Sequence, residues 1–228
     1  MTIFSPLRKI ISCTLKLIVF VSAFAGTLLS WYADKVEFMG GKRVFMYFTI
    51  QSNIAIAIIC AIGFFLLLLN KEISSVWNVI KFTGTIAITL TGVVFAFVLA
   101  PTIGDAAWNP QNTLTHLVVP VAAVIDFFVS CYDAGIQKKN IIYIIIPPLL
   151  YVIYAAIGFV KGWQFGDGIN YPYFFLNWRS PAGAFGFSKE LPFMGTVWWI
   201  ISLLIFLLLI SFGYLMLADF IAKKIKKN

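Results

Sequence analysis

Apolar residues occur in this chain as six long runs separated by shorter polar stretches. Each run is about 20 residues long, the length at which a helix rising about 1.5 Å per residue crosses a bilayer. The predicted spans are Ile10–Ser30, Phe45–Leu69, Ile80–Ala100, Thr113–Cys131, Ile141–Val160 and Thr196–Leu217. The runs are about twice as long as a barrel strand, and few alternate with a period of two. The pattern therefore predicts an all-α polytopic membrane protein, a bundle of six transmembrane helices.

The composition excludes a water-soluble fold. Mean hydropathy is +0.94, and 61% of the residues are hydrophobic, which is more than a water-exposed surface carries. Most connections between the runs are short and none has the composition of a linker. Residues 1–228 are therefore predicted to form a single transmembrane domain, and the pattern defines no oligomeric state.

The basic residues predict an orientation for the bundle. They gather at the N-terminus, in the second and fourth connections and at the C-terminus, as Arg8, Lys9, Lys71, Lys138, Lys139, Lys223, Lys224, Lys226 and Lys227. The positive-inside rule then places both termini in the cytoplasm. Lys35, Lys42 and Arg43 in the first connection oppose this orientation, although Asp34 and Glu37 accompany them. The net charge of +8 is thus explained by topology and contact with anionic lipid, and no nucleic-acid partner is expected.

The first run has features of a secretory signal, because Arg8 and Lys9 precede an apolar stretch with small residues. It is long enough to cross the membrane, so we expect it to be retained. The three cysteines, Cys13, Cys60 and Cys131, lie in or at the ends of spans, where they act as small apolar residues. Their spacing predicts neither a disulfide framework nor a metal site, and no cofactor is expected.

The fifth connection, from Lys161 to Gly195, is long and rich in aromatic residues and glycine. Aromatic side chains are enriched where a membrane meets water, which favours an interfacial belt. The alternative is a lid over a site that receives an acyl chain. Both interpretations place this loop outside.

His116 is the only histidine and lies at the outer end of the fourth run. By helical rise, Thr49 and His116 lie about 6 Å and about 5 Å below the outer ends of their spans. If these spans are neighbours, the imidazole can take the hydroxyl proton as the oxygen attacks an ester carbonyl. The alternatives are a threonine bonded to its own i−4 carbonyl and a histidine that is half solvated or bonded to a neighbour.

Further polar residues lie at the same level. Gln51, Ser52 and Asn53 follow Thr49, and the Asn53 amide is a candidate donor to an oxyanion. Asn112, one turn before His116, is a candidate to orient the ring. Pro120 cannot donate to the carbonyl of His116, which predicts a kink beside a cavity.

Asp126 is too far from His116 to orient it, because ten residues of helix span about 15 Å. A carboxylate in the inner half of a span needs a partner, and Lys16 and Lys81 lie at a similar depth. A structural ion pair is predicted. Thr85, Thr89, Gly92 and Ala96 form a stripe of small residues that favours close helix packing.

Three segments together resemble the androgen-induced membrane protein family and its bacterial six-span relatives. They are Tyr47–Asn53, His116 with Pro120, and Tyr171–Asn177, and the likeness covers nearly the whole chain. The resemblance implies a six-helix hydrolase of a bacterial plasma membrane in which a threonine and a histidine cleave fatty acid esters of hydroxy fatty acids. By this resemblance the threonine is Thr49 and the histidine is His116. Asn177 stands where bacterial relatives often have an acid.

Two functions from different classes remain open. The favoured one is an intramembrane threonine hydrolase whose partners are membrane lipids and a lipid or acyl-ester substrate. The other is a small transporter or lipid-binding protein in which His116 is a protonation switch. Against a transporter, the chain shows neither an internal repeat nor paired broken helices. Haem binding is disfavoured because one histidine cannot provide two axial imidazoles.

Overall fold

The computed structural model describes residues 5–33 and 41–227, and these residues form helices and no β-strand. Asp34, Lys35 and Glu37, which entered the prediction of orientation, lie outside the described residues. The α-helices are α1 (Pro6–Tyr32), α2 (Phe48–Leu68), α3 (Ser75–Val94), α4 (Ala100–Ile103), α5 (Pro110–Thr113), α6 (Val119–Cys131), α7 (Ile146–Val160) and α8 (Thr196–Lys227). In the described part of the chain, six helical stretches are long and apolar enough to cross a membrane, which confirms the predicted fold class.

Local sequence signals define where two of the spans begin. The Ser5 side chain accepts a hydrogen bond from the backbone N–H of Arg8, and Pro6 occupies the first position of α1. The Ser74 side chain caps α3 in the same way through Trp77. Both arrangements satisfy an N–H group that a helix leaves free at its start.

Several predicted boundaries are wrong, and the last helix continues from the predicted end at Leu217 to Lys227. The second helix begins at Phe48 and not at Phe45, because a 3₁₀ segment, Gly41–Met46, precedes it. The connection expected between Ala100 and Thr113 is almost wholly helical, since its prolines stand in the first turns of α4 and α5, where no intrahelical N–H is needed. The fifth span begins as a 3₁₀ segment, Lys138–Ile145, and becomes α-helical only at Ile146.

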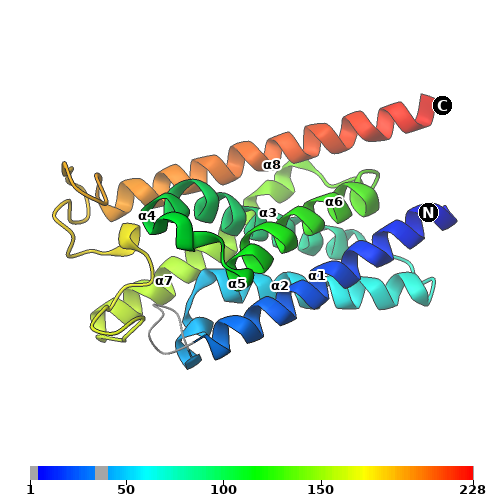
Figure 1. Ribbon diagram of the computed structural model, residues 1–228. Helices are drawn as coiled ribbons and strands as arrows, with labels where there is room; N and C mark the ends of the chain where they lie inside the picture. Colours follow the sequence, from blue (N-terminus) through cyan, green and yellow to red (C-terminus); the bar gives the residue numbers. More distant parts are fainter. Residues whose placement is uncertain (1–4, 34–40, 228) are drawn as a thin grey trace.

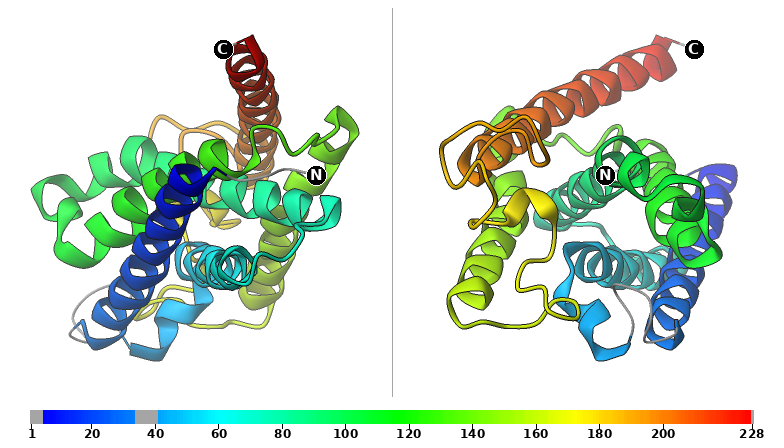
Figure 2. Two further views of the ribbon diagram at one scale, coloured as in Figure 1. Left: turned by 90° about the vertical axis from the view of Figure 1, so that its right-hand side faces the viewer. Right: turned by 60° about the vertical axis from the view of Figure 1, so that its left-hand side comes forward.

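The helices lie side by side, with both termini at one end of the bundle and the loop of residues 161–195 at the other (Figure 1). We call these the termini end and the loop end. Helices α1, α2, α3 and α6 pack together, whereas α8 contacts mainly the 3₁₀ segment before α7 (Figure 2). Their shared core contains buried apolar side chains, among them Val19, Ile56, Ile88 and Val119.

A buried ion cluster joins α1, α3 and α6 in the half of the bundle toward the termini end. The Asp126 carboxylate is fully buried and lies 2.7 Å from the Lys16 ammonium and 2.6 Å from that of Lys81. The Ser12 hydroxyl donates to the same carboxylate at 2.7 Å. The predicted ion pair is therefore present with both candidate lysines, and it fixes the helix that carries His116.

Close approach between α3 and α6 depends on Gly92 in the small-residue stripe. A Cβ atom at Gly92 would lie 3.0 Å from the His116 carbonyl oxygen and 3.1 Å from the Pro120 ring. A larger side chain would therefore push α6 away from α3. This contact holds the backbone of His116 close to α3 and so helps to position the imidazole.

Candidate functional site

Two π-helical segments, Phe95–Leu99 and Leu114–Val118, face each other at the loop end. Pro120 has no N–H to donate to the His116 carbonyl, so the regular α-helical bond at this point is missing. Single π-turns of this kind are frequent at functional sites. The two segments carry Phe95 and His116, whose rings stack with centroids 3.8 Å apart and an interplanar angle of 21°.

The His116 imidazole meets the Thr49 hydroxyl in the interior. Nε2 lies 3.3 Å from Thr49 Oγ1, and both side chains are buried, with 6% and 5% of their residue surfaces exposed. The contact predicted from the depth of the two residues is thus present. Among the described residues, the Thr49 hydroxyl is bonded to His116 and Tyr173 and not to the carbonyl one turn earlier.

The other ring nitrogen shows which tautomer the site holds. His116 Nδ1 lies 3.1 Å from the backbone oxygen of Asn112, which can only accept a hydrogen bond. It also lies 3.0 Å from Thr115 Oγ1, whose proton is donated to the Gln111 carbonyl. Nδ1 therefore carries the proton, and Nε2 presents its lone pair to the Thr49 hydroxyl.

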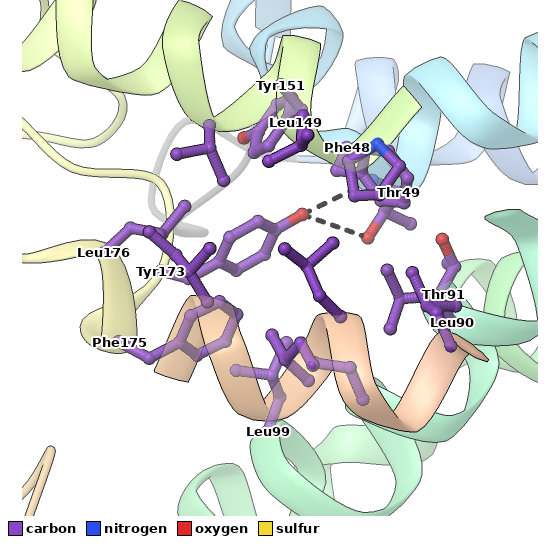
Figure 3. A pocket seen from close by; sticks show the side chains of 17 residues that line it. Phe48, Thr49, Leu90, Thr91, Leu99, Leu149, Tyr151, Tyr173, Phe175 and Leu176 are labelled. Carbon is purple, nitrogen blue, oxygen red and sulfur yellow. Dashed lines mark hydrogen bonds between the residues drawn. The ribbon is translucent and has the colours of Figure 1, made fainter. Parts of the chain in front are cut away.

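Tyr173 is the third side chain of the site, and it comes from the loop between the fifth and sixth spans. Its hydroxyl lies 3.3 Å from the Thr49 backbone nitrogen and 3.4 Å from Thr49 Oγ1 (Figure 3). Burial raises the pKa of the Tyr173 phenol above its usual value. The hydroxyl is therefore neutral, and it accepts a hydrogen bond from the backbone N–H of Thr49 in the first turn of α2.

The sequence did not single out Tyr173 as a site residue. It stands among many aromatic residues of the loop, and the only signal was its place in the Tyr171–Asn177 segment. In the structure its ring stacks on Phe175, with centroids 5.2 Å apart, and also contacts Tyr47 and Tyr151. The loop therefore reaches down onto the site, although Phe185, Phe187 and Phe193 remain exposed.

An apolar cavity of about 70 Å³ opens beside Thr49, between α3, α7 and α8 (Figure 3). Most of its walls are aliphatic and aromatic, and its polar lining comes from Thr49, Thr91, Tyr151 and Tyr173. His116 lies behind Thr49 and does not line the cavity. The hydroxyl thus has an apolar space on one side and a base on the other.

The remaining predicted residues take roles that differ from the expected ones. The Asn53 amide nitrogen donates to the carbonyls of Thr49 and Thr115, so it is not free for an oxyanion. Ser52 bonds Thr91, and the exposed Gln51 turns back to the Phe45 carbonyl. Asn112 does hold the imidazole, but through its backbone oxygen, because its side chain donates to Ala107.

The chain matches no family model, no curated protein and no solved structure. Within residues 5–33 and 41–227, no three His, Cys, Asp or Glu side chains are grouped as a metal site requires. The side chains that meet at the loop end are an alcohol, an imidazole and a phenol. A nucleophile hydrogen-bonded to a base whose other nitrogen is held by a third group is the arrangement used in covalent acyl transfer.

Proposed function

We propose that this protein is an intramembrane hydrolase that cleaves a lipid or fatty-acyl ester, with Thr49 as nucleophile and His116 as general base. The observation that carries the proposal is the contact of Thr49 Oγ1 with His116 Nε2 while Nδ1 is held by the Asn112 carbonyl. A free alcohol is a weak nucleophile and needs such a base. The resemblance of the Thr49 and His116 segments to the androgen-induced family leads to the same reaction.

In the first step Thr49 Oγ1 attacks the ester carbonyl carbon, and its proton passes to His116 Nε2. The tetrahedral intermediate collapses when the imidazolium returns this proton to the leaving alcohol oxygen. The acyl group then remains on Thr49, and the alcohol departs. The 3.3 Å separation of the two atoms is at the long end for proton transfer, and such bonds shorten when substrate is bound.

Several groups of the site stabilise the charges that develop during this step. The Tyr173 hydroxyl lies beside the reacting oxygen and can donate to the carbonyl oxygen as it becomes negative. The attack also takes place at the N-terminal turn of α2, where the helix dipole stabilises negative charge. The positive charge on His116 is stabilised by the Asn112 carbonyl and by the face of Phe95.

In the second step water attacks the acyl-Thr49 carbonyl, and His116 Nε2 takes the water proton. The same nitrogen then protonates Thr49 Oγ1 as it leaves, which releases the fatty acid and restores the alcohol. The net reaction consumes one ester and one water molecule, and both side chains return to their starting states.

The apolar walls of the cavity favour a substrate with a hydrocarbon chain. A volume of about 70 Å³ is well below the roughly 300–1,000 Å³ of typical ligand sites. Substrate binding therefore requires Tyr173 and its segment to move outward, which makes the loop a lid. With both termini in the cytoplasm of a bacterium, the site would face the outer leaflet of the plasma membrane.

Turnover of a panel of acyl esters by the purified protein tests the proposal. Thr49→Ala and His116→Ala should each lower kcat by at least about 1,000-fold, as in other nucleophile and base pairs. Thr49→Ser keeps the hydroxyl and should retain measurable activity. Thr102→Ala, at an exposed position of α4, is the matched control and should behave as the wild type. Hydrolysis that survives both alanine substitutions would exclude this mechanism.

A further inference from the structure

A second and much larger cavity, of about 880 Å³, lies between α2, α3 and α7 and is separate from the one beside Thr49. Helix α3 lines it from Ser75 to Ala87, a distance of about 18 Å along the helix. This is more than half of the roughly 30 Å hydrocarbon core of a bilayer. We call this cavity the α2–α7 groove.

The lining of the α2–α7 groove is mainly apolar, with Gln51 and Ser52 toward the loop end and a basic side chain at the termini end. Residues such as Ala55, Ile59, Val79 and Leu150 form its walls. Lys139, Gln137, Asn140 and Ser75 lie where the groove reaches the termini end of the bundle. No described carboxylate lies within 4.0 Å of the Lys139 ammonium. The groove thus has one positively charged end and a long hydrophobic body.

We propose that the α2–α7 groove is a binding site for a long-chain carboxylate, with the acid group at Lys139 and the alkyl chain between α2 and α7. The charge at one end complements an anion, and a volume of about 880 Å³ is in the range of small-molecule sites. The site goes beyond the proposed hydrolase and does not depend on it.

A free carboxylate fits this groove better than an anionic phospholipid. The groove provides one basic side chain, Lys139, at the end of a mainly apolar lining. One basic side chain at one end of an apolar groove matches one acid group on one alkyl chain, whereas a phospholipid carries two acyl chains on one head group. Lys138 is adjacent in sequence but does not line the groove, which makes it the natural control for the role of charge.

The α2–α7 groove and the cavity beside Thr49 share a thin wall. Phe48 and Tyr151 line both spaces and pack edge to face, with centroids 5.3 Å apart. Next to them, Ser52 on the groove side bonds Thr91 on the cavity side at 2.7 Å. In the closed form, a ligand in the groove therefore contacts this wall and does not reach Thr49.

Photolabelling with palmitic acid that carries a diazirine on its chain tests the site. The full chain is reconstituted in zwitterionic lipid nanodiscs, with Thr49→Ala as the background so that no ester is consumed, and labelled peptides are mapped by mass spectrometry. Saturable labelling should fall on α2, α3 and α7 and be competed by palmitate. The methyl ester of palmitic acid should compete at least about fivefold less well, because it lacks the charge that one lysine attracts.

Two matched pairs of variants separate specific binding from contact with surrounding lipid. Ala55→Trp fills the groove and should reduce labelling at least about fivefold, because the chain loses its place. Ile58→Trp, on a lipid-exposed part of α2 outside the groove, should leave it unchanged. Lys139→Gln should weaken binding of the acid about fivefold and leave binding of the methyl ester unchanged. Lys138→Gln should leave the binding of both ligands unchanged.

Several results would overturn the proposal. Labelling that does not saturate, or that is equal in Ala55→Trp and Ile58→Trp, would mean that the probe reports bulk lipid only. Competition by phosphatidylglycerol as effective as that by palmitate would assign the groove to a phospholipid headgroup. Because every arm lacks the Thr49 hydroxyl, failure here is independent of whether the protein hydrolyses esters.

Discussion

Asp126→Asn should destabilise this protein strongly, and the reason is the imbalance of charge in the buried cluster. One carboxylate faces two ammonium groups at 2.7 and 2.6 Å, and its oxygens are fully buried. The amide keeps the shape but removes the negative charge, which leaves Lys16 and Lys81 unpaired in an apolar interior. Losing one partner of a buried ion pair costs about 3–5 kcal/mol.

The same arrangement predicts that Lys81→Met lowers the stability of the protein much less than Asp126→Asn does. This substitution leaves Asp126 paired with Lys16 and bonded to Ser12, and the remaining formal charges balance. The linear methionine fills the space of the lysine stem. The expected cost is about 1 kcal/mol or less, because the large cost of removing one partner arises from a buried charge left uncompensated, and here none is left.

Thermal unfolding of the detergent-solubilised variants, followed by circular dichroism, measures the difference. For a chain of this size, about 3–5 kcal/mol corresponds to a fall in Tm of about 6–20 °C for Asp126→Asn. Lys81→Met should stay within about 4 °C of the wild type. Equal losses in the two variants would refute the view that Asp126 alone neutralises the cluster, and so would a stable Asp126→Asn protein.

Two further predictions concern the site. Tyr173→Phe should lower kcat about 100-fold while Tm changes little, because the phenol is expected to donate to the developing oxyanion; unchanged kcat in steady-state ester hydrolysis would remove Tyr173 from the reaction. Gly92→Val should lower kcat by about 100-fold, because the new side chain meets the His116 carbonyl and the Pro120 ring and a shift of about 1 Å at the base has this effect. Full activity in a folded Gly92→Val protein would show that the spacing of α3 and α6 does not set the Thr49 geometry.

The six spans could be predicted from the sequence because each is an apolar run of membrane length. This property can be read from the run itself and does not depend on how the helices pack. The sequence was less reliable at the helix ends, where 3₁₀ and π-helical segments and prolines in first turns decide the boundary. The shared level of Thr49 and His116 followed from counting residues along two helices. Their contact depends also on Gly92, which brings α3 close to the carbonyl of His116.

The parts of the site that were missed depend on tertiary structure. Tyr173 lies in an irregular loop, where no periodicity indicates which of many aromatic rings points inward. The Asn53 amide turns to two carbonyls, one of them on the helix that carries His116, so its direction follows from helix packing. The two cavities lie where α7, and for the smaller one also α8, meets α2 and α3, and hydropathy carries no information on the spacing of such helices.

The most direct test of the central claim is detection of the acyl group on Thr49. The purified protein is mixed briefly with a long-chain activated ester, quenched in acid and digested, and the Thr49 peptide is examined by tandem mass spectrometry. We predict a mass increase equal to the acyl group on Thr49, formed at least about 1,000-fold more slowly in His116→Ala and absent from Thr49→Ala. Ester hydrolysis at the normal rate with the acyl group on another residue would contradict the account.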